Sequence, residues 1–131
     1  MTNERFLLDT NVVLLALTRP KSLSPPARKA VAAGPNVLSV IVYWEVMLKA
    51  MKGTLTVGHP RTWWLDALDM LAATVLPLES KHIERVHDLP AIHKDPFDRM
   101  LIAQASAETC VLVTTDGEIP KYKTRHIRVI S

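Results

Sequence analysis

The sequence has a single cysteine, Cys110, and none of the Cys and His spacings that are typical of zinc sites. One cysteine excludes an internal disulfide, and its apolar surroundings fit a reducing compartment. No apolar run approaches the ~20 residues that cross a bilayer. The first residues also lack the basic start and the apolar stretch of a secretion signal. We therefore expect a cytoplasmic protein that does not associate with a membrane.

Internal repeats, low-complexity tracts and linkers are also missing. The 131 residues are 48% apolar and 22% charged, which is typical of a globular chain that buries a real core. We therefore expect one domain over residues 1–131. The 16 basic side chains exceed the 13 acidic ones and give a net charge of +3, which is a mild indication of an anionic partner.

Short apolar segments alternate with helix-forming segments along the chain. Strands are expected at residues 5–9, 36–39, 74–78, 111–115 and 126–130. Helices are expected at residues 10–18, 24–34, 40–53, 60–73 and 80–89, and from residue 95 onward. In the fourth helix, Trp64, Leu65 and Leu68 are expected on one apolar stripe. This alternation predicts an α/β fold with a parallel sheet and helices on both of its faces.

Four acids fall where such a sheet binds ligands, beyond the carboxyl ends of its strands. Asp9 ends the first strand, and Asp116 directly follows the fourth. Glu45 lies about two turns into the helix after the second strand. Asp98 lies in the first turn of the helix that leads into the fourth strand. Because crossover helices begin at the carboxyl side of the sheet, the topology gathers these four acids at one edge.

Each of these acids also has a structural interpretation. Asp9 suits a helix cap, and Asp116 suits a turn. Asp95 is a favoured helix cap, and Asp98 then falls at the third helical position, where an acid can reach back to the cap. Glu45 is the only charged residue in a long apolar stretch, so a structural role requires an ion pair or a route to solvent.

Four carboxylates in one cleft repel each other, and their desolvation adds to the cost. Divalent cations remove this cost, and Mg²⁺ and Mn²⁺ prefer oxygen ligands. One or two such ions can activate a water and stabilise the leaving oxygen in phosphodiester cleavage. Removing these four acids from the 13 leaves nine acidic residues against 16 basic ones. The remaining surface would then suit a polyanionic substrate.

These segments resemble the PIN-domain ribonucleases and, within them, the VapC-type toxins of type II toxin–antitoxin pairs. Four stretches match the family's motifs in order: "LLDTNVVLLAL", "WEVMLKAMKGTL", "HKDPFDRMLIAQA" and "LVTTDGEI". The resemblance implies that the catalytic, metal-binding acids are Asp9, Glu45, Asp98 and Asp116. It also implies supporting roles for Asn11, which follows the first acid, and for Thr114, which precedes the last.

The resemblance further implies a three-layer α/β/α sandwich with a five-stranded parallel sheet. It implies Mg²⁺- or Mn²⁺-dependent cleavage of single-stranded or structured RNA, a homodimer, and inhibition by a cognate antitoxin. Two alternatives remain open at this point. The first is a PIN-fold module that binds RNA or a partner without catalysis. The second is a phosphatase of the haloacid-dehalogenase type. That family requires a second Asp at the position where this chain has Asn11.

Four aromatic side chains lie close together in the sequence. We expect them to contact an amphipathic helix of the antitoxin. They are Tyr43, Trp44, Trp63 and Trp64, of which one of the two adjacent tryptophans is expected in the core.

Four basic side chains either contact phosphate or form a solvated face: Lys49, Lys52, Arg61 and Arg99. Arg99 is the favoured phosphate contact because it adjoins Asp98. His82 and His87 lie five residues apart and do not fit a metal motif, so we expect them on the surface.

Overall fold

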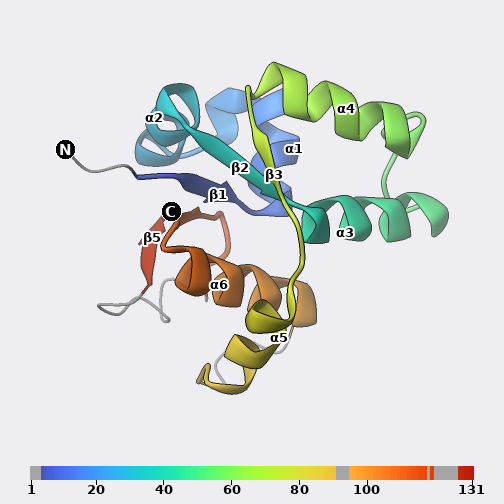
Figure 1. Cartoon of the computed structure of the whole chain (residues 1–131). Helices are drawn as coiled ribbons and strands as arrows, with labels where there is room; N and C mark the ends of the chain where they lie inside the picture. Colours follow the sequence, from blue (N-terminus) through green and yellow to red (C-terminus); the bar gives the residue numbers. More distant parts are fainter. Residues whose placement is uncertain (1–3, 91–94, 118, 120–126) are drawn as a thin grey trace.

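Five short strands form one parallel sheet (Figure 1). The computed structural model describes residues 4–90, 95–117, 119 and 127–131. The strands are β1 (Phe6–Leu8), β2 (Asn36–Ser39), β3 (Thr74–Leu76), β4 (Val111–Val113) and β5 (Arg128–Ile130). Their order is β3-β2-β1-β4-β5, and every neighbouring pair is parallel. The first strand therefore lies in the middle of the sheet and brings its carboxyl end to the centre of that edge.

Helices cover both faces of this sheet. They are α1 (Thr10–Thr18), α2 (Pro25–Ala33), α3 (Val40–Met51), α4 (Pro60–Met70), α5 (Ser80–His87) and α6 (Pro96–Glu108), with a short 3-10 turn η1 (Pro20–Ser22). Figure 1 shows α1, α2 and α4 on one side of the sheet and α5 and α6 on the other. The predicted three-layer α/β/α fold is confirmed. Within the described residues, every helix is too short or too polar to cross a bilayer.

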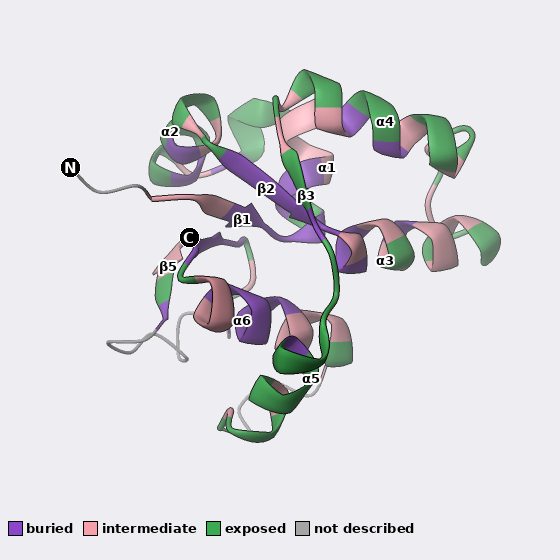
Figure 2. Ribbon diagram, viewed as in Figure 1, coloured by how far each residue is buried: buried purple, intermediate pink, exposed green. Residues whose placement is uncertain are grey.

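The core lies where the strands meet the inner sides of the helices (Figure 2). Leu7 and Leu8 of β1 are fully buried, as is Leu112 of β4 beside them. Leu101 and Ile102 of α6 are also fully buried. Burial of each such side chain contributes roughly 1.5–3 kcal/mol, so the middle of the sheet and α6 form a stable base for the loops at the strand ends.

The fourth helix differs from its prediction in length and in buried side. It ends at Met70 rather than near residue 73, because Ala72 takes a left-handed conformation with φ 48°. Leu65 is 63% exposed, whereas Trp64 and Ala67 face the core. The predicted apolar stripe was therefore wrong at Leu65 and correct at Trp64.

The predicted second strand has the same bounds as β2, whereas the first, third and fourth predicted strands extend too far. The first strand omits the two polar ends of residues 5–9, and the third and fourth each stop two residues earlier than predicted. The described part of the last strand starts at Arg128, and His126 lies outside the described residues.

Candidate functional site

A polar cavity of about 280 Å³ opens beyond the carboxyl ends of the central strands. It is lined by Asp9, Thr10, Asn11, Glu45, Lys49, Asp95, Asp98, Thr115 and Asp116. All four predicted acids thus line one cavity, together with a fifth carboxylate, Asp95. The crossover connections of the parallel sheet bring these residues together from four separate segments of the chain.

Asp9 is the most buried acid of this cavity, with 4% of its surface exposed. Its Oδ1 accepts a hydrogen bond from the Val12 backbone N–H at 2.8 Å, which caps α1, and its Oδ2 accepts one from the Thr114 hydroxyl. Burial is the main cause that raises the pKa of the Asp9 carboxyl above its ordinary value. Hydrogen bonds from Thr114, Val12 and the Thr115 backbone N–H oppose this rise in pKa, and the nearby Asp116 charge adds to it. Asp9 therefore both caps a helix and presents a costly buried charge.

Glu45 projects from the second turn of α3 into the same cavity. Its Oε1 accepts a hydrogen bond from the Thr10 hydroxyl at 2.5 Å, and its Oε2 lies 3.2 Å from the Lys49 ammonium. The side chain of Glu45 is 13% exposed and that of Lys49 is 48% exposed. The ion pair expected from a structural role is thus present, and it lies inside the acid cavity. No local pattern in the sequence indicates a role for Thr10, because its contact with Glu45 joins two separate helices.

Asp95 and Asp98 lie together at the start of α6. The Oδ1 atom of Asp95 accepts hydrogen bonds from the backbone N–H groups of Phe97 at 2.8 Å and Asp98 at 3.2 Å. Asp95 is therefore the N-cap of α6, and Pro96 occupies the first helical position. Asp98 lies in the first turn, where the helix dipole favours a negative charge, and its carboxylate lines the cavity.

Polar side chains after β4 complete the wall of the cavity. The buried Thr114 hydroxyl donates to Asp9 and accepts a hydrogen bond from the Asp116 backbone N–H at 3.0 Å. Asn11 donates its side-chain N–H to the Thr115 hydroxyl at 2.7 Å. Thr114 therefore links the first acid to the last, and Asn11 joins the start of α1 to the same loop.

Arg99 does not line this cavity. Its guanidinium donates to the backbone carbonyls of Val86 at 3.1 Å and Pro90 at 3.0 Å, which holds the end of α5 against α6. Among the four basic candidates, Lys49 lines the cavity, and Lys52, Arg61 and Arg99 do not. A direct contact between Arg99 and a phosphate at the acids thus stays an untested prediction that this geometry disfavours.

The four predicted aromatic contacts differ in exposure and in their ring partners. Tyr43 stacks on Trp64 with ring centroids 4.8 Å apart, so these two rings fill the junction between α3 and α4. Trp63 is half-buried beside Trp64, with centroids 6.5 Å apart. Trp44 is 54% exposed and meets the edge of Phe97 at 5.0 Å. Trp44 is therefore the aromatic side chain that is most available to a partner.

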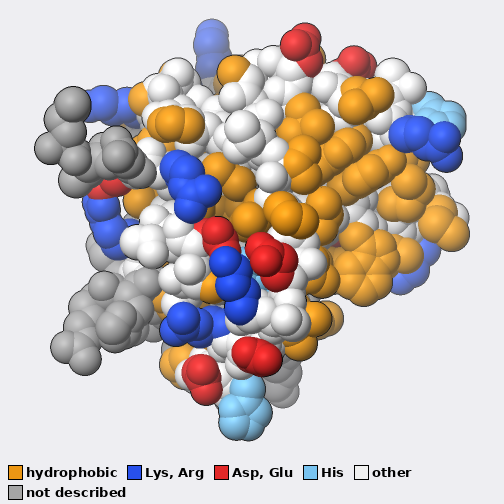
Figure 3. Space-filling model, viewed as in Figure 1, with side chains coloured by type: hydrophobic (Ala, Val, Ile, Leu, Met, Phe, Trp, Pro, Cys, Tyr) orange, Lys and Arg blue, Asp and Glu red, His pale blue; other side chains and the backbone are white. Residues whose placement is uncertain are grey.

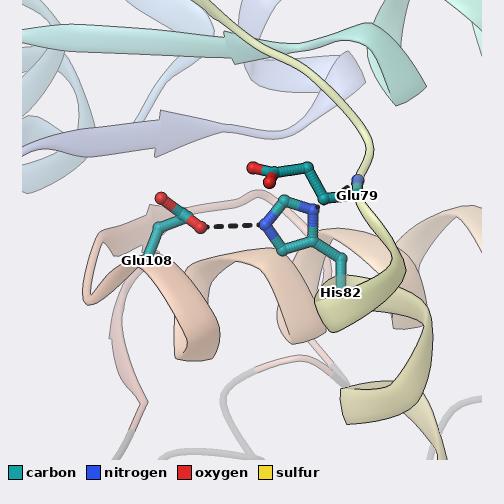
Figure 4. Close-up of side chains that lie close together, drawn as sticks. All are labelled: Glu79, His82 and Glu108. Carbon is teal, nitrogen blue, oxygen red and sulfur yellow. Dashed lines mark hydrogen bonds and ion pairs between the residues drawn. The ribbon is translucent and has the colours of Figure 1, made fainter.

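A second cluster of potential metal ligands lies between α5 and α6 and contains Glu79, His82 and Glu108 (Figure 4). The expectation that His82 is on the surface was wrong, because its ring is fully buried. Its Nδ1 accepts a hydrogen bond from the Glu79 backbone N–H at 3.0 Å, and its Nε2 lies 2.9 Å from a Glu108 oxygen. The proton of the neutral ring therefore sits on Nε2, where it is donated to Glu108.

This proton arrangement argues against a metal in the second cluster. A metal at Nε2 needs the lone pair of that nitrogen, so the ring proton would have to move to Nδ1, where the Glu79 N–H already points. The Lys81 ammonium also lies 2.9 Å from Glu108 and supplies a cation. The cluster is a structural network that fixes the start of α5 on α6.

A sequence model of the PIN domain matches residues 6–124. The chain belongs to the PIN-domain family. Members of this family are nucleases, and they generally use divalent metal ions. A comparison with curated protein sequences gave no significant match.

Solved structures with the same fold support this assignment. VapBC2 from Rickettsia felis, solved with a DNA fragment from its promoter, is 15% identical with a TM-score of 0.67, covering 95% of this chain and 96% of that chain. A toxin–antitoxin complex from Klebsiella pneumoniae is 23% identical with a TM-score of 0.62, covering 92% and 93%. DNA-bound VapBC from Salmonella typhimurium is 18% identical with a TM-score of 0.65, covering 97% of each chain. At these identities the likeness shows a shared fold.

The acid cavity of this PIN domain fits a divalent cation by its donor set. Five carboxylates line it, and Lys49 is the one basic side chain among the described residues that does so. Oxygen ligands alone suit Mg²⁺ or Mn²⁺ rather than a softer metal. The buried Asp9 carboxylate, whose pKa is raised by burial, accepts hydrogen bonds from neutral donors and would gain most from a cation.

Proposed function

We propose that this protein is a metal-dependent endoribonuclease that hydrolyses phosphodiester bonds in single-stranded or structured RNA. The observation that carries the proposal is the cavity that gathers Asp9, Glu45, Asp98 and Asp116 at the carboxyl edge of the sheet. A structural role, such as a helix cap or an ion pair, can explain each of these acids separately. Such roles do not explain why like charges that repel each other share one cavity. A site for one or two Mg²⁺ or Mn²⁺ ions explains this arrangement.

In this proposal, the four acids hold the metal, and their neighbours fix the carboxylate oxygens. When bound, the metal supplies Lewis acidity and a strong nucleophile at neutral pH. The Thr114 hydroxyl holds one oxygen of Asp9, and the Thr10 hydroxyl holds one oxygen of Glu45. Such hydrogen bonds keep ligand oxygens in place and are typical of working metal sites. Asn11 supports the loop that carries Asp116.

We further propose that the nuclease is the toxin of a type II toxin–antitoxin pair, acts in the cytoplasm as a homodimer, and is held inactive by an antitoxin. The solved structures above that share its fold are toxin–antitoxin complexes, which supports this part. Hydrophobic side chains also gather on the face formed by α3, α4 and β3 (Figure 3). Trp44 lines two apolar hollows, one of about 240 Å³ along α3 and one of about 170 Å³ between α3 and α6. An exposed apolar surface of this kind suits a protein partner.

RNA cleavage by the purified protein tests the nuclease proposal. A labelled single-stranded RNA should be cut with Mn²⁺ or Mg²⁺ and should stay intact with EDTA. Asp98→Asn should lower the rate at least about 100-fold, because loss of a mere supporting partner already costs 10–100-fold. Asp69→Asn, an exposed acid of α4, is the matched control and should cut normally. Binding of RNA without cleavage at any metal concentration would instead support the non-catalytic module.

A further inference from the structure

Lys49 places a positive charge inside a cavity whose other charges are negative. Its ammonium lies 3.2 Å from Glu45 Oε2, one helical turn away on the same face of α3. The other oxygen of Glu45 accepts a hydrogen bond from the Thr10 hydroxyl at 2.5 Å. Both oxygens of this acid are therefore engaged before any metal binds.

A metal that takes Glu45 as a ligand must compete with this ammonium. Two cations on one carboxylate repel each other, so Lys49 has to leave when the metal arrives. The side chain can do so, because it is 48% exposed and has four rotatable bonds. The Thr10 hydroxyl needs no such movement, because it is neutral and can hold its oxygen in either state.

We propose that Lys49 is an exchangeable counter-ion of the acid cavity. Without metal, it neutralises Glu45; with metal bound, it is released at the rim of the cavity and contacts a phosphate of the RNA. This inference rests on the proposed nuclease function and adds to it a positioning residue whose partner changes between the two states. Lys52 lies three residues farther along, at the exposed end of α3, and does not line the cavity, so it provides a matched control.

Titration of Mn²⁺ into metal-free protein tests whether Lys49 competes with the metal for Glu45. Lys49→Gln should bind Mn²⁺ about two- to fivefold more tightly than the wild type, the size expected when an exposed ion pair no longer competes. Without metal, the variant should melt at a lower temperature, and saturating Mn²⁺ should close most of that gap. A purely structural Lys49 would lower both melting temperatures equally. Lys49→Met, which keeps the aliphatic stem, is a second variant and should behave like Lys49→Gln. The control Lys52→Gln should match the wild type in both measurements.

The kinetics of RNA cleavage at saturating Mn²⁺ test whether Lys49 contacts a phosphate of the RNA. Lys49→Gln should raise KM severalfold and change kcat much less, because the lost contact is to a phosphate. An unchanged KM alongside tighter Mn²⁺ binding overturns the phosphate contact alone. Unchanged or weaker Mn²⁺ binding in both Lys49 variants overturns the counter-ion exchange while the nuclease proposal stands. If the wild type binds no Mn²⁺ without RNA, this inference fails, whereas the nuclease proposal fails only if RNA also stays intact with Mn²⁺.

Discussion

At the scale of single residues, Asp95 and Asp98 differ in their tasks although they lie three positions apart. Asn caps a helix about as well as Asp, so Asp95→Asn should keep the start of α6, with a loss of ~0.3–1 kcal/mol from the helix-dipole charge term. Asp98→Asn should abolish metal binding and RNA cleavage but keep the fold. Its metal-free form should melt at the same or a higher temperature, because one carboxylate repulsion is gone. The measurements are RNA cleavage and melting temperature for both variants.

The opposite result would reverse these roles. Loss of cleavage in Asp95→Asn at full stability, with normal cleavage in Asp98→Asn, would assign the metal to Asp95. Loss of cleavage in both variants would give Asp95 a second role, which its position in the cavity wall allows.

Asp9 leads to a pH prediction. Burial raises the pKa of its carboxyl in the folded protein, so the folded state holds the proton more tightly than the unfolded state. The metal-free protein should therefore lose stability as the pH rises from the ordinary Asp value through the raised pKa. Asp9→Asn should remove this loss, so its advantage in melting temperature should grow with pH and disappear in acid. An advantage that does not change with pH would mean that Asp9 ionisation is not the cause.

The sequence indicated the individual acids and, through the family resemblance, their neighbours Asn11 and Thr114, but it did not indicate Thr10. Asp9 and Asp116 directly follow apolar strands, which is a local signal. The contact of Thr10 with Glu45 and the burial of His82 depend on residues 35 and 26 positions away, so no local pattern indicates them. Contacts between side chains of distant elements are therefore less predictable than acids that follow an apolar strand.

At the scale of elements, the junction of α5 with α6 depends on the Glu108 carboxylate. Hydrogen bonds from Lys81 and His82, together with the Lys81 charge, hold the pKa of this carboxyl below its ordinary value. Glu108 therefore contributes stability at neutral pH that is lost as the pH falls through its lowered pKa. Glu108→Gln should lower the free energy of unfolding by about 1–3 kcal/mol at pH 7. The difference should vanish in acid, as measured by denaturant unfolding at several pH values.

A matched variant on α5 separates this network from a general loss of charge. Glu84 is exposed on α5, and Glu84→Gln should change the free energy of unfolding within about 0.5 kcal/mol at any pH. Equal losses in Glu84→Gln and Glu108→Gln would argue against a specific junction.

Element boundaries were predicted well only where a residue type marks them. Gly53 follows the end of α3 with φ 74°, a left-handed conformation that glycine adopts without strain, and the sequence predicted this end within two residues. The end of α4 uses Ala72 in a similar conformation with φ 48°, and alanine carries no such signal. Tertiary packing rather than local preference therefore determines where α4 stops.

At the scale of the whole molecule, the sheet order explains why acids from four distant segments share one cavity. β1 lies between β2 and β4, so the segments that follow these three strands begin side by side. The helix α6 starts at the same edge because it must return to the amino end of β4. The fold thus determines the position of the carboxylates, and the charge of Asp116 adds to the cost of the buried Asp9 charge.

Divalent metal should therefore stabilise the whole fold. A ligand that binds only the folded state adds RT ln(1 + [L]/Kd), or about 2.7 kcal/mol at a concentration of 100 times Kd. For a domain of this size, that corresponds to a rise in melting temperature of roughly 5–15 °C. Millimolar Mn²⁺ or Mg²⁺ should raise the melting temperature above that in EDTA, and Asp98→Asn should remove most of the rise. A charge-matched variant outside the cavity, Asp66→Asn, should keep it. An equal rise in all three proteins would indicate nonspecific binding of metal to the surface, and no rise in the wild type would show that the acids need substrate phosphate to complete the site.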